Sequence, residues 1–448
     1  MNTAPLKIAI VGSGISGLAA AHALRGRANI TLYEAGGYFG GHTHTVDVTL
    51  PSAAGPNSSS ITHGIDTGFL VFNERTYPNL IKLLAELDVK TAQSDMSFSV
   101  QVPRPGSFKG ALEWSGSNLN TVFAQRSNLL SPKFWRMLRD LVRFNTLATQ
   151  LAETGAEAAL MQPLQDFLYE HRFSTEFRDW YLLPMLGCIW SCPTGQMLKF
   201  PVATMIRFCH NHGLIQVSNR PQWWTVAGGA KHYVEKIVAN IADKRLNTPV
   251  HCIKRDLEGI QIVTHERTER FDKVIIATHS DQALALLQQS SYAERAALSA
   301  ISYQANTAVL HTDASVLPQR KAAWAAWNYE RVELNADKPD TTSVCLHYLI
   351  NKLQPVPFEQ PVIVSLNPVK PINPVHVLGT FDYAHPVFDL SAIKAQAEIP
   401  ALQGKSNTYF CGAWMGYGFH EDGLKAGLDV ARRILAEMDK QLDWKEAA

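Results

Sequence analysis

The sequence has 448 residues, of which 46% are hydrophobic and 18% are charged. A chain of this length exceeds the size at which one hydrophobic core usually keeps growing, so we expect an ordinary globular protein with two domains. Its 41 basic and 40 acidic residues nearly cancel, which argues against a nucleic-acid-binding protein. The six cysteines contain no CxxC pair, which disfavours a disulfide framework and a zinc cluster and favours a reducing cytoplasm.

The apolar start of the chain, Lys7 to Leu24, predicts a strand, a turn and a helix rather than a signal peptide. It is interrupted by Gly12, Gly14 and Gly17, and no basic leader precedes it. No later stretch supplies the run of about 20 uninterrupted apolar residues that spans a bilayer. Attachment to a membrane surface stays open.

The same segment predicts a βαβ unit that binds a dinucleotide. The apolar run KIAIV is followed by GSGISG, by apolar residues at helical spacing and by a second apolar run, ITLY. In such a turn Gly12 permits a tight bend, Gly14 lets the backbone approach a pyrophosphate, and Gly17 lets the helix pack on the strand. Glu34, about 20 residues past the central glycine, is suited to accept hydrogen bonds from ribose hydroxyls.

The next segments predict a loop and a helical cap. GGYFGGHTHT is followed by PSAAGPNSSS, whose small and polar residues indicate an exposed loop or hairpin tip. From about Tyr77 to Arg220 the sequence is rich in helical patterns such as PNLIKLLAEL, which predicts an inserted helical cap. Strand patterns resume near Thr225.

The second half predicts further strands. A hairpin-like run from Pro249 to Thr268 precedes a buried strand, Phe271 to Thr278, and a helix then begins at HSDQALALL. Strand patterns at Asn306–His311 and Ser343–Ile350 indicate a second sheet. The proline-rich segment Pro355–Pro374 is expected to be loop or edge strand. The C-terminal region predicts a strand, a glycine turn and a long helix.

Four separated stretches resemble one protein family. They are GSGISGLAAAHAL with Glu34, the Gly40–Gly41 pair, AGGAKHYV, and YFCGAWMGYGFHEDGLKAG. They are similar to the FAD-dependent amine oxidase, protoporphyrinogen oxidase and phytoene desaturase superfamily. Within it, GGHTHTV, DTGFLVFNERTYPNL and RFCHNHGL resemble bacterial predicted NAD/FAD-binding proteins found beside or fused to cyclopropane-fatty-acid synthases. That likeness implies a lipid acyl substrate.

The resemblance implies an α/β fold, in which a Rossmann-type FAD-binding domain carries an inserted substrate domain of mixed sheet and helices. FAD is expected to be bound non-covalently, because no residue matches the cysteine by which some amine oxidases attach flavin; Cys411 is the nearest candidate. We expect the FAD-binding domain to comprise residues 1–75, 225–300 and 400–440, and the substrate or cap domain to comprise residues 76–224 and 301–399.

The resemblance also implies cofactor-binding positions. The Gly40–Gly41 pair would pass close to the flavin ring or ribityl chain, the backbone of Val250 would meet the adenine, and the helix near Gly423 would point its positive end at the flavin. Asp66 fits a cofactor contact and a turn cap equally well. The expected cofactor-binding residues are Gly12, Ser13, Gly14, Ile15, Ser16, Gly17, Glu34, Ala35, Gly40, Gly41, His42, Thr43, Asp66, Gly68, Val250, Ala277, Gly412, Ala413, Gly418, Asp422 and Gly423.

Three features limit the chemistry. Ala413 stands where relatives often carry a glutamate, which argues against a ribityl or phosphate contact through that carboxylate. The strand Asn306–His311 contains no lysine of the kind that amine oxidases place near flavin N5, which weakens amine oxidation specifically. His42 and His44 form an HxH pair, but no carboxylate or cysteine cluster completes a metal site, so no metal is expected.

His420 is the candidate catalytic residue. It lies three residues before Gly423, where amine oxidases place one aromatic wall of the substrate site. We expect it to face the flavin, either as a general acid or base or as a structural histidine. The aromatic residues of the cap are expected to be mostly core, with a part of them lining an apolar tunnel to the flavin: Trp180, Trp190, Trp223 and Trp224.

These observations predict an FAD-dependent oxidoreductase that removes a hydride from a C–H bond of a hydrophobic substrate, such as a lipid acyl chain, and passes the electrons to an unidentified acceptor. Flavin-dependent isomerisation and amine oxidation are the enzymatic alternatives. An alternative of another class is a flavin-binding partner of a lipid-modifying enzyme. The flavin scaffold hosts many chemistries, so the fold alone does not fix the substrate.

Overall fold

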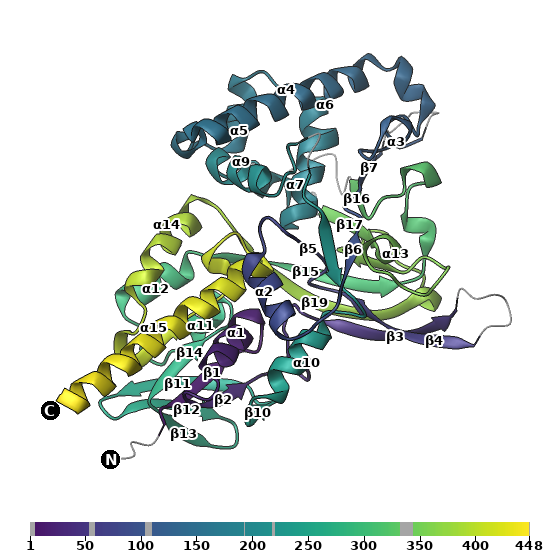
Figure 1. Ribbon diagram of the computed structural model, residues 1–448. Coiled ribbons are helices and arrows are strands. Elements are labelled where there is room, and N and C mark those ends of the chain that lie inside the picture. Colours follow the sequence, from purple (N-terminus) through teal and green to yellow (C-terminus); the bar gives the residue numbers. More distant parts are fainter. Residues whose placement is uncertain are drawn as a thin grey trace.

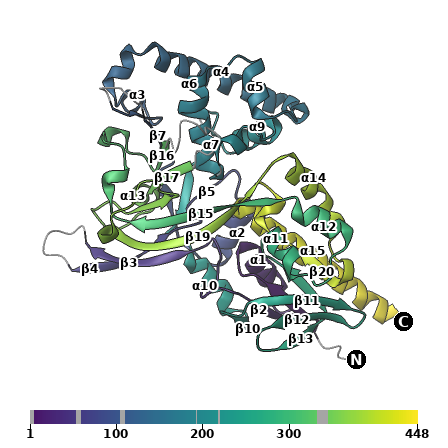
Figure 2. The same ribbon diagram turned by 180° about the vertical axis from the view of Figure 1, so that it is seen from behind.

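The molecule has three parts in the computed structural model, which describes residues 5–52, 59–103, 110–191, 193–216, 220–331 and 344–447. A parallel sheet with its helices lies at one end, a larger mixed sheet lies in the middle, and the helices of residues 132–211 lie at the other end (Figures 1 and 2). No helix of the described residues is long and apolar enough to cross a membrane.

The first part is built on a five-stranded parallel sheet with the order β10-β2-β1-β14-β20. The central strands are short apolar runs buried on both faces, as expected where helices cover a parallel sheet. Segments far apart in the sequence therefore form one sheet. Its strands are β1 (Lys7–Val11), β2 (Asn29–Tyr33), β10 (Asp243–Arg245), β14 (Lys273–Ile276) and β20 (Thr408–Phe410).

Two helices cross closely on this sheet: α1 (Ile15–Leu24), which is almost wholly buried, and α15 (His420–Ala447). A Cβ atom added to Gly427 would lie 2.1 Å from the carbonyl oxygen of Ser16, and one added to Gly423 would lie 2.8 Å from Cγ2 of Ile15. Glycine at these two positions therefore permits the close approach of the helices. The other helices of this part are α2 (Pro78–Glu86), α10 (Lys231–Ala239), α11 (Ser280–Leu286), α12 (Tyr292–Ser299) and α14 (Leu390–Glu398).

The hairpin-like run predicted before the buried strand is confirmed. The run forms the antiparallel pair β11–β12, and β13, which begins at its last residue, adds a third strand to this sheet. The buried strand predicted for Phe271–Thr278 is the shorter β14, and the predicted helix after it is α11. The antiparallel strands are β11 (Val250–Asp256), β12 (Gly259–Thr264) and β13 (Thr268–Phe271).

The middle part is a seven-stranded sheet with the order β19-β15-β18-β17-β16-β7-β8. Its neighbours are antiparallel except for β16 and β7, so the sheet is mixed, as expected. Two of its strands, β7 and β8, come from the segment that was expected to be helical. The strands are β7 (Phe98–Val102), β8 (Leu112–Ser115), β15 (Ser302–His311), β16 (Trp327–Arg331), β17 (Val344–Leu349), β18 (Ile363–Leu366) and β19 (Val377–Val387).

The prediction that Pro355–Pro374 is loop or edge strand is wrong for its middle. Strand β18 pairs with β15 on one side and with β17 on the other, so it lies inside the sheet. The prolines of this segment all flank Ile363–Leu366 and none lies within it, so every residue of the strand has an N–H group to donate.

Short strands connect the parts. β3 (Thr45–Pro51) and β4 (Ser60–Asp66) form an antiparallel hairpin, and residues 53–58 of the polar stretch expected at its tip lie outside the described residues. β9 (Trp223–Val226) pairs with β5 (Phe72–Asn73) and β6 (Thr91–Ser94).

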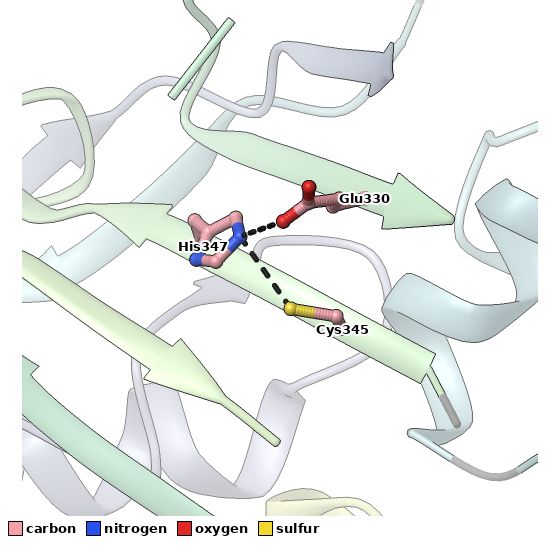
Figure 3. Close-up of side chains that lie close together, drawn as sticks. All are labelled: Glu330, Cys345 and His347. Atoms are coloured by element: carbon pink, nitrogen blue, oxygen red, sulfur yellow. Dashed lines mark hydrogen bonds and ion pairs between the residues drawn. The ribbon is translucent and has the colours of Figure 1, made fainter. Parts of the chain in front are cut away.

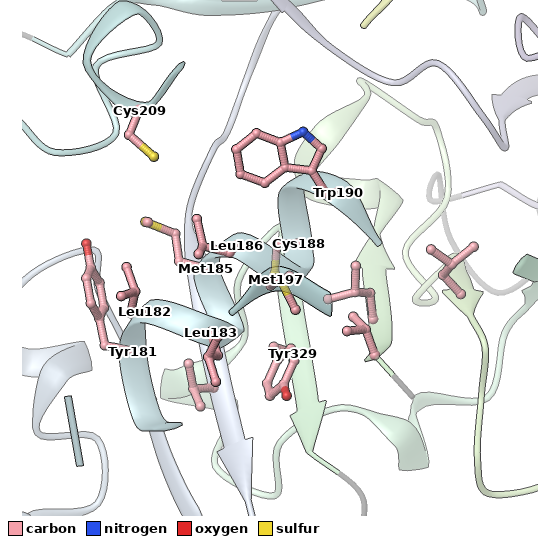
Figure 4. Packing of buried hydrophobic residues seen from close by; sticks show 14 of the residues in the cluster. Tyr181, Leu182, Leu183, Met185, Leu186, Cys188, Trp190, Met197, Cys209 and Tyr329 are labelled. Atoms are coloured by element: carbon pink, nitrogen blue, oxygen red, sulfur yellow. The ribbon is translucent and has the colours of Figure 1, made fainter. Parts of the chain in front are cut away.

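A layer of helices packs on the middle sheet, and it comes from the later part of the segment that was expected to form a helical cap. Side chains of α7 interdigitate with Tyr329 of β16 (Figure 4), and Gly187 lies so close to β17 that an added Cβ would be 3.2 Å from Val344 Cγ1. A π-helical turn, Arg178–Leu182, leads into α7. The helices of this part are α4 (Pro132–Thr154), α5 (Leu164–Glu170), α6 (Thr175–Phe177), α7 (Leu183–Trp190), α8 (Thr194–Met197) and α9 (Val202–Asn211). Two short helices, α3 (Leu119–Val122) and α13 (Ile350–Leu353), lie beside strands of the middle sheet.

The hydrophobic cores do not follow the expected segments strictly. Leu80 and Leu84 of α2 belong to the core of the parallel sheet, although their segment was assigned to the substrate domain. Val48 and Ile65 of the β3–β4 hairpin belong to the core of the seven-stranded sheet, although theirs was assigned to the FAD-binding domain. The first hundred residues therefore contribute to both cores.

Candidate active site

A continuous cavity of about 730 Å³ joins the N-terminal glycine turn to the seven-stranded sheet. Every expected site residue lines it except Gly17, Asp66, Asp422 and Gly423. Those that line it are Gly12, Ser13, Gly14, Ile15, Ser16, Glu34, Ala35, Gly40, Gly41, His42, Thr43, Gly68, Val250, Ala277, Gly412, Ala413, Gly418 and His420.

The turn between β1 and α1 forms one end of the cavity. Gly12 has φ +101°, and a Cβ atom there would lie 2.8 Å from the carbonyl oxygen of Ala277. Gly14 is the N-cap of α1 with no side-chain cap, and a Cβ atom there would meet no described atom within 4 Å. The first N–H groups of α1 therefore start beside open space, which is the arrangement that binds phosphates at helix N-termini.

Glu34 ends β2 beside this turn. Its Oε2 accepts hydrogen bonds from the backbone N–H of Ser13 at 3.0 Å and from the Ser13 hydroxyl, and its Oε1 accepts one from the N–H of Gly36 at 2.8 Å. A carboxylate has about four acceptor positions, so ribose hydroxyls still find room on it. Thr248 and Val250, at the start of β11, line the same end of the cavity.

Two glycine-rich loops close around the middle of the cavity. Gly40 has φ +122°, and Gly41 lies so close to the turn that an added Cβ would be 3.2 Å from Cα of Gly14. From the other side, Gly412 and Gly418 bracket a short 3₁₀ turn ahead of α15. Backbone rather than side chains therefore lines this region, where a flat ring can approach closely.

Three of the expected residues that do not line the cavity support its walls. Asp422 accepts hydrogen bonds from the N–H groups of Tyr417 and Phe419, both at 3.0 Å, and burial raises its pKa to about 6. Gly17 and Gly423 serve close packing instead: a Cβ atom on Gly17 would lie 2.0 Å from the carbonyl oxygen of Gly12. The loop before α15 is thus held by the helix itself.

Asp66 also lies behind the wall and is fully buried. Its carboxylate accepts hydrogen bonds from the Thr45 hydroxyl at 2.5 Å, the Ala230 N–H at 2.9 Å and the Gln354 amide at 2.8 Å. It thereby ties the β3–β4 hairpin to the start of α10 and to α13. Of the two roles considered for it, these contacts fit the structural one.

A model of the flavin-containing amine oxidoreductase family matches residues 15–435, nearly the whole chain. The chain belongs to this family. No curated protein matches the sequence. Membership makes the protein an FAD-dependent oxidoreductase, and the glycine turn, Glu34 and the backbone-lined middle of the cavity fit that cofactor.

Solved structures of other enzymes share the fold. Cyclohexylamine oxidase from Brevibacterium oxydans IH-35A is 16% identical, with a TM-score of 0.65 over 97% of this chain and 100% of that chain. The CLA-producing fatty acid isomerase from P. acnes is also 16% identical, with a TM-score of 0.63 over 96% of this chain and 98% of that chain. At this identity the likeness concerns the fold, which combines the Rossmann-type domain with a mixed-sheet domain.

In this flavin oxidoreductase His420 is buried at the first turn of α15 and lines the cavity. Its Nε2 lies 2.7 Å from the Tyr233 hydroxyl, which in turn is hydrogen-bonded to the Thr43 hydroxyl. Its ring stacks on Phe69 with centroids 3.8 Å apart. Burial lowers the pKa of His420 to about 3, so the ring is neutral at physiological pH.

Three further histidines of the cavity were not expected from the sequence, of which His212 lies at its far end. His279 and His385 lie with His42 on one wall, with ring centroids 6.1 Å and 5.3 Å from that of His42. Burial lowers the pKa of His385 to about 4 and that of His42 to about 3. Nε2 of His42 is buried and has no hydrogen-bond partner among the described residues, so it offers a free acceptor to a bound cofactor or substrate.

The other end of the cavity is an apolar chamber between the cap helices and the seven-stranded sheet. Of the four tryptophans singled out from the sequence, Trp223 lines the cavity, whereas Trp180, Trp190 and Trp224 do not. The chamber wall comprises Met96, Phe98, Met185, Cys188, Ile189, Phe208, Leu214, Trp223, Trp327, Tyr348, Leu366 and Phe419. Side chains alternate between the two faces of strands β16 and β17. This alternation could have indicated from the sequence that Trp327 and Tyr348 face the same side.

Proposed function

We propose that this flavin oxidoreductase acts on an uncharged hydrophobic substrate, with a lipid acyl chain as the substrate class. A hydride leaves one C–H bond and a proton leaves the adjacent carbon, so that a C=C bond forms. FAD, when bound, supplies the hydride acceptor. The observation that carries the proposal is the apolar chamber at the end of the cavity away from the glycine turn.

The charge of the cavity wall supports an uncharged substrate. Among the residues that the structure describes, Glu34 is the one charged residue in the lining, and it lies at the dinucleotide end. A protonated amine in the apolar chamber would find no carboxylate there. Burying an unpaired charge is costly, so a neutral chain is the better occupant.

The histidines add no charge either. His212 lines the chamber, and burial lowers its pKa to about 4; His42, His385 and His420 are neutral for the same reason. The aromatic wall made by Phe69 and the His420 ring can orient a substrate by contact and exclude water from it.

One wall histidine has a fixed hydrogen-bonding role. Asn306 Nδ2 donates to His385 Nδ1 at 2.7 Å, and Asn367 Nδ2 donates to the Asn306 carbonyl oxygen at 2.7 Å. The neutral His385 ring therefore carries its proton on Nε2 and is a donor toward its remaining neighbours. Asn306 lies on β15, the strand in which an amine oxidase would be expected to carry a lysine.

The test is anaerobic mixing of the FAD-loaded protein with three substrates: a long-chain acyl ester, the free fatty acid and putrescine, a dication. We expect flavin absorbance to bleach with the ester and not with putrescine. Bleaching by putrescine alone would contradict the proposal. Conversion of the acyl chain to a product of unchanged mass without net reduction would indicate isomerisation, and no turnover of any lipid would favour the role of binding partner.

A matched pair of leucines in the seven-stranded sheet distinguishes an effect on the chamber from a general effect of the substitution on the protein. Leu366 lines the cavity and is 4% exposed, whereas Leu378 is 39% exposed. Leu366→Asp is expected to slow bleaching by the acyl ester while bound FAD stays unchanged, and Leu378→Asp to leave both unchanged. Comparison of lipids from cells with and without the protein then identifies the acyl species.

A further inference from the structure

We propose that Glu330, Cys345 and His347 bind a zinc ion on the face of the seven-stranded sheet that points away from the flavin cavity. The three side chains converge from β16 and β17, two adjacent strands (Figure 3). No step of the proposed flavin reaction uses them. The site would be a second, separate centre of the molecule.

The strand register brings the three residues together. Glu330 pairs directly with Cys345 across the antiparallel ladder, and His347 follows Cys345 by two residues, so all three side chains share one face. Trp327 and Tyr348 lie an odd number of residues from the cluster along their strands, so they point to the opposite face, where they line the flavin cavity. The cluster is therefore separated from the cavity by the sheet itself.

The distances match those between ligands of one zinc ion. His347 Nε2 lies 3.4 Å from Cys345 Sγ and 3.2 Å from Glu330 Oε2. With Zn–N and Zn–O lengths of about 2.0 Å and a Zn–S length of about 2.3 Å, tetrahedral ligands lie roughly 3.3–3.6 Å apart. Each residue offers one ligand atom, and all three atoms lie within 4.8 Å of one another.

The charges also balance. Glu330, Cys345 and His347 are 4%, 0% and 1% exposed, and burying charged groups this deeply is costly unless they are compensated. A thiolate and a carboxylate carry two negative charges, which Zn²⁺ neutralises, while His347 binds as the neutral ring. Lys370, which bonds the other oxygen of Glu330, has a 68% exposed side chain, so its charge is hydrated.

The surroundings orient the ligands as metal sites require. Nδ1 of His347 lies 2.6 Å from the Ser365 hydroxyl, which leaves Nε2 free to face the ion. Gln101 Nε2 donates to Glu330 Oε1 at 3.4 Å. The buried Oε1 of Gln101 has no hydrogen-bond partner among the described residues, so it is available as a fourth ligand or for a zinc-bound water.

This inference departs from the expectation that no metal binds. That expectation rested on the absence of a local ligand motif, and Cys345 and His347 alone form only a C-x-H pair. Glu330 joins them because β16 pairs with β17, and no local sequence pattern indicates this pairing. Soft thiolate and imidazole with one carboxylate favour zinc over calcium or magnesium, which prefer oxygen ligands.

The test uses the FAD-loaded full chain with its thiols reduced. The protein is treated with a chelator, dialysed against Zn²⁺ alone, and its metal content is measured by elemental mass spectrometry. We expect one zinc per chain. Cys345→Ser and Glu330→Gln are expected to lose the zinc while flavin absorbance is retained, and Ser365→Ala is expected to weaken zinc binding by about 10- to 100-fold.

Cys252→Ser is the matched control, because Cys252 lies on β11 outside the cluster and its variant should keep the zinc. Co²⁺ replaces the zinc in a parallel sample, and a thiolate-bound ion should absorb at wavelengths beyond the flavin bands. If the reduced wild type takes up no zinc, or if Cys345→Ser keeps it, the proposal is wrong. Should a cluster variant fail to fold, the cobalt spectrum of the wild type decides alone.

Discussion

At the scale of single residues, His420 combines two properties that bear on its role. Its ring forms a wall with Phe69, and its Nε2 is engaged by Tyr233. An imidazole whose pKa is about 3 is a weak base, far from the operating pH that favours general acid–base catalysis. We therefore propose that His420 orients the substrate and does not move a proton.

Substitutions of His420 distinguish these roles. We expect His420→Phe to keep its FAD and to retain turnover within about tenfold, because it preserves the aromatic wall and proton transfer typically contributes about 10²- to 10⁴-fold. His420→Ala should be slower than His420→Phe. The reductive half-reaction is followed anaerobically by flavin absorbance. A loss of 10²-fold or more in the phenylalanine variant, with full FAD, would show that the imidazole carries a proton.

Asp66 predicts a pH dependence of stability. Burial raises its pKa from 3.8 to about 7, against the opposing effect of the hydrogen bonds it accepts. The folded protein thus holds the proton more tightly than the unfolded chain, so the stabilising contribution is complete below pH 3.8 and declines as the pH rises through about 7.

Asp66→Asn removes this titration. We expect the free energy of unfolding of the wild type, relative to that of the variant, to fall between pH 4 and pH 8 and then to level off. Urea denaturation of the FAD-loaded proteins at several pH values measures the difference. A difference that does not change with pH would mean that the carboxyl has its ordinary pKa in the folded state.

At the scale of elements, the crossing of α1 and α15 couples the glycine turn to the closing loop. Gly427→Ala would place a Cβ atom 2.1 Å from the Ser16 carbonyl oxygen, which α15 can relieve only by moving away from α1. We expect a destabilisation of about 1–3 kcal/mol and weaker FAD binding. Ala436→Val, on the exposed side of the same helix, is the control. Thermal unfolding and FAD titration measure both; an unchanged alanine variant would contradict the close crossing.

Local patterns predicted the elements that adjacent residues specify. The turn after KIAIV and the closing segment around Gly418 carry their glycines within one run, so strand, turn and helix could be assigned. The interior position of β18 could not, because its partners β15 and β17 are chosen by long-range pairing. His279 and His385 were missed for the same reason, since each is a lone histidine that reaches His42 only through the sheet order.

At the scale of the whole molecule, bound FAD should add to stability because it binds the folded chain alone. The increment grows as the free FAD concentration exceeds its dissociation constant, reaching about 2.7 kcal/mol at 100-fold excess. We expect non-covalent attachment, so the FAD should also leave the protein on acid precipitation. Yellow colour in the pellet would indicate a covalent link, with Cys411 the first residue to examine.

Gly14→Val tests whether the stability added by FAD depends on binding at the glycine turn. Gly14 has φ −62°, which any residue adopts, and its side chain would point into open space, so the FAD-free variant should be as stable as the FAD-free wild type. We expect it to be colourless and to gain no stability from added FAD. Gly116→Val, at a glycine outside the cavity lining, is the control. A Gly14→Val protein that kept full FAD would disprove the assignment of the pyrophosphate turn.

The strand order of the parallel sheet has a consequence for biosynthesis. The ribosome delivers β1, α1 and β2 well before their sheet neighbours β14 and β20 and the covering helix α15, because these elements follow much later in the sequence. A nascent chain halted before Thr408 carries the dinucleotide turn without the wall from Gly412 to His420, and its α1 surface stays uncovered. Such chains expose apolar surface until α15 has been made, so we expect chaperones to bind them and cofactor capture to wait for that helix.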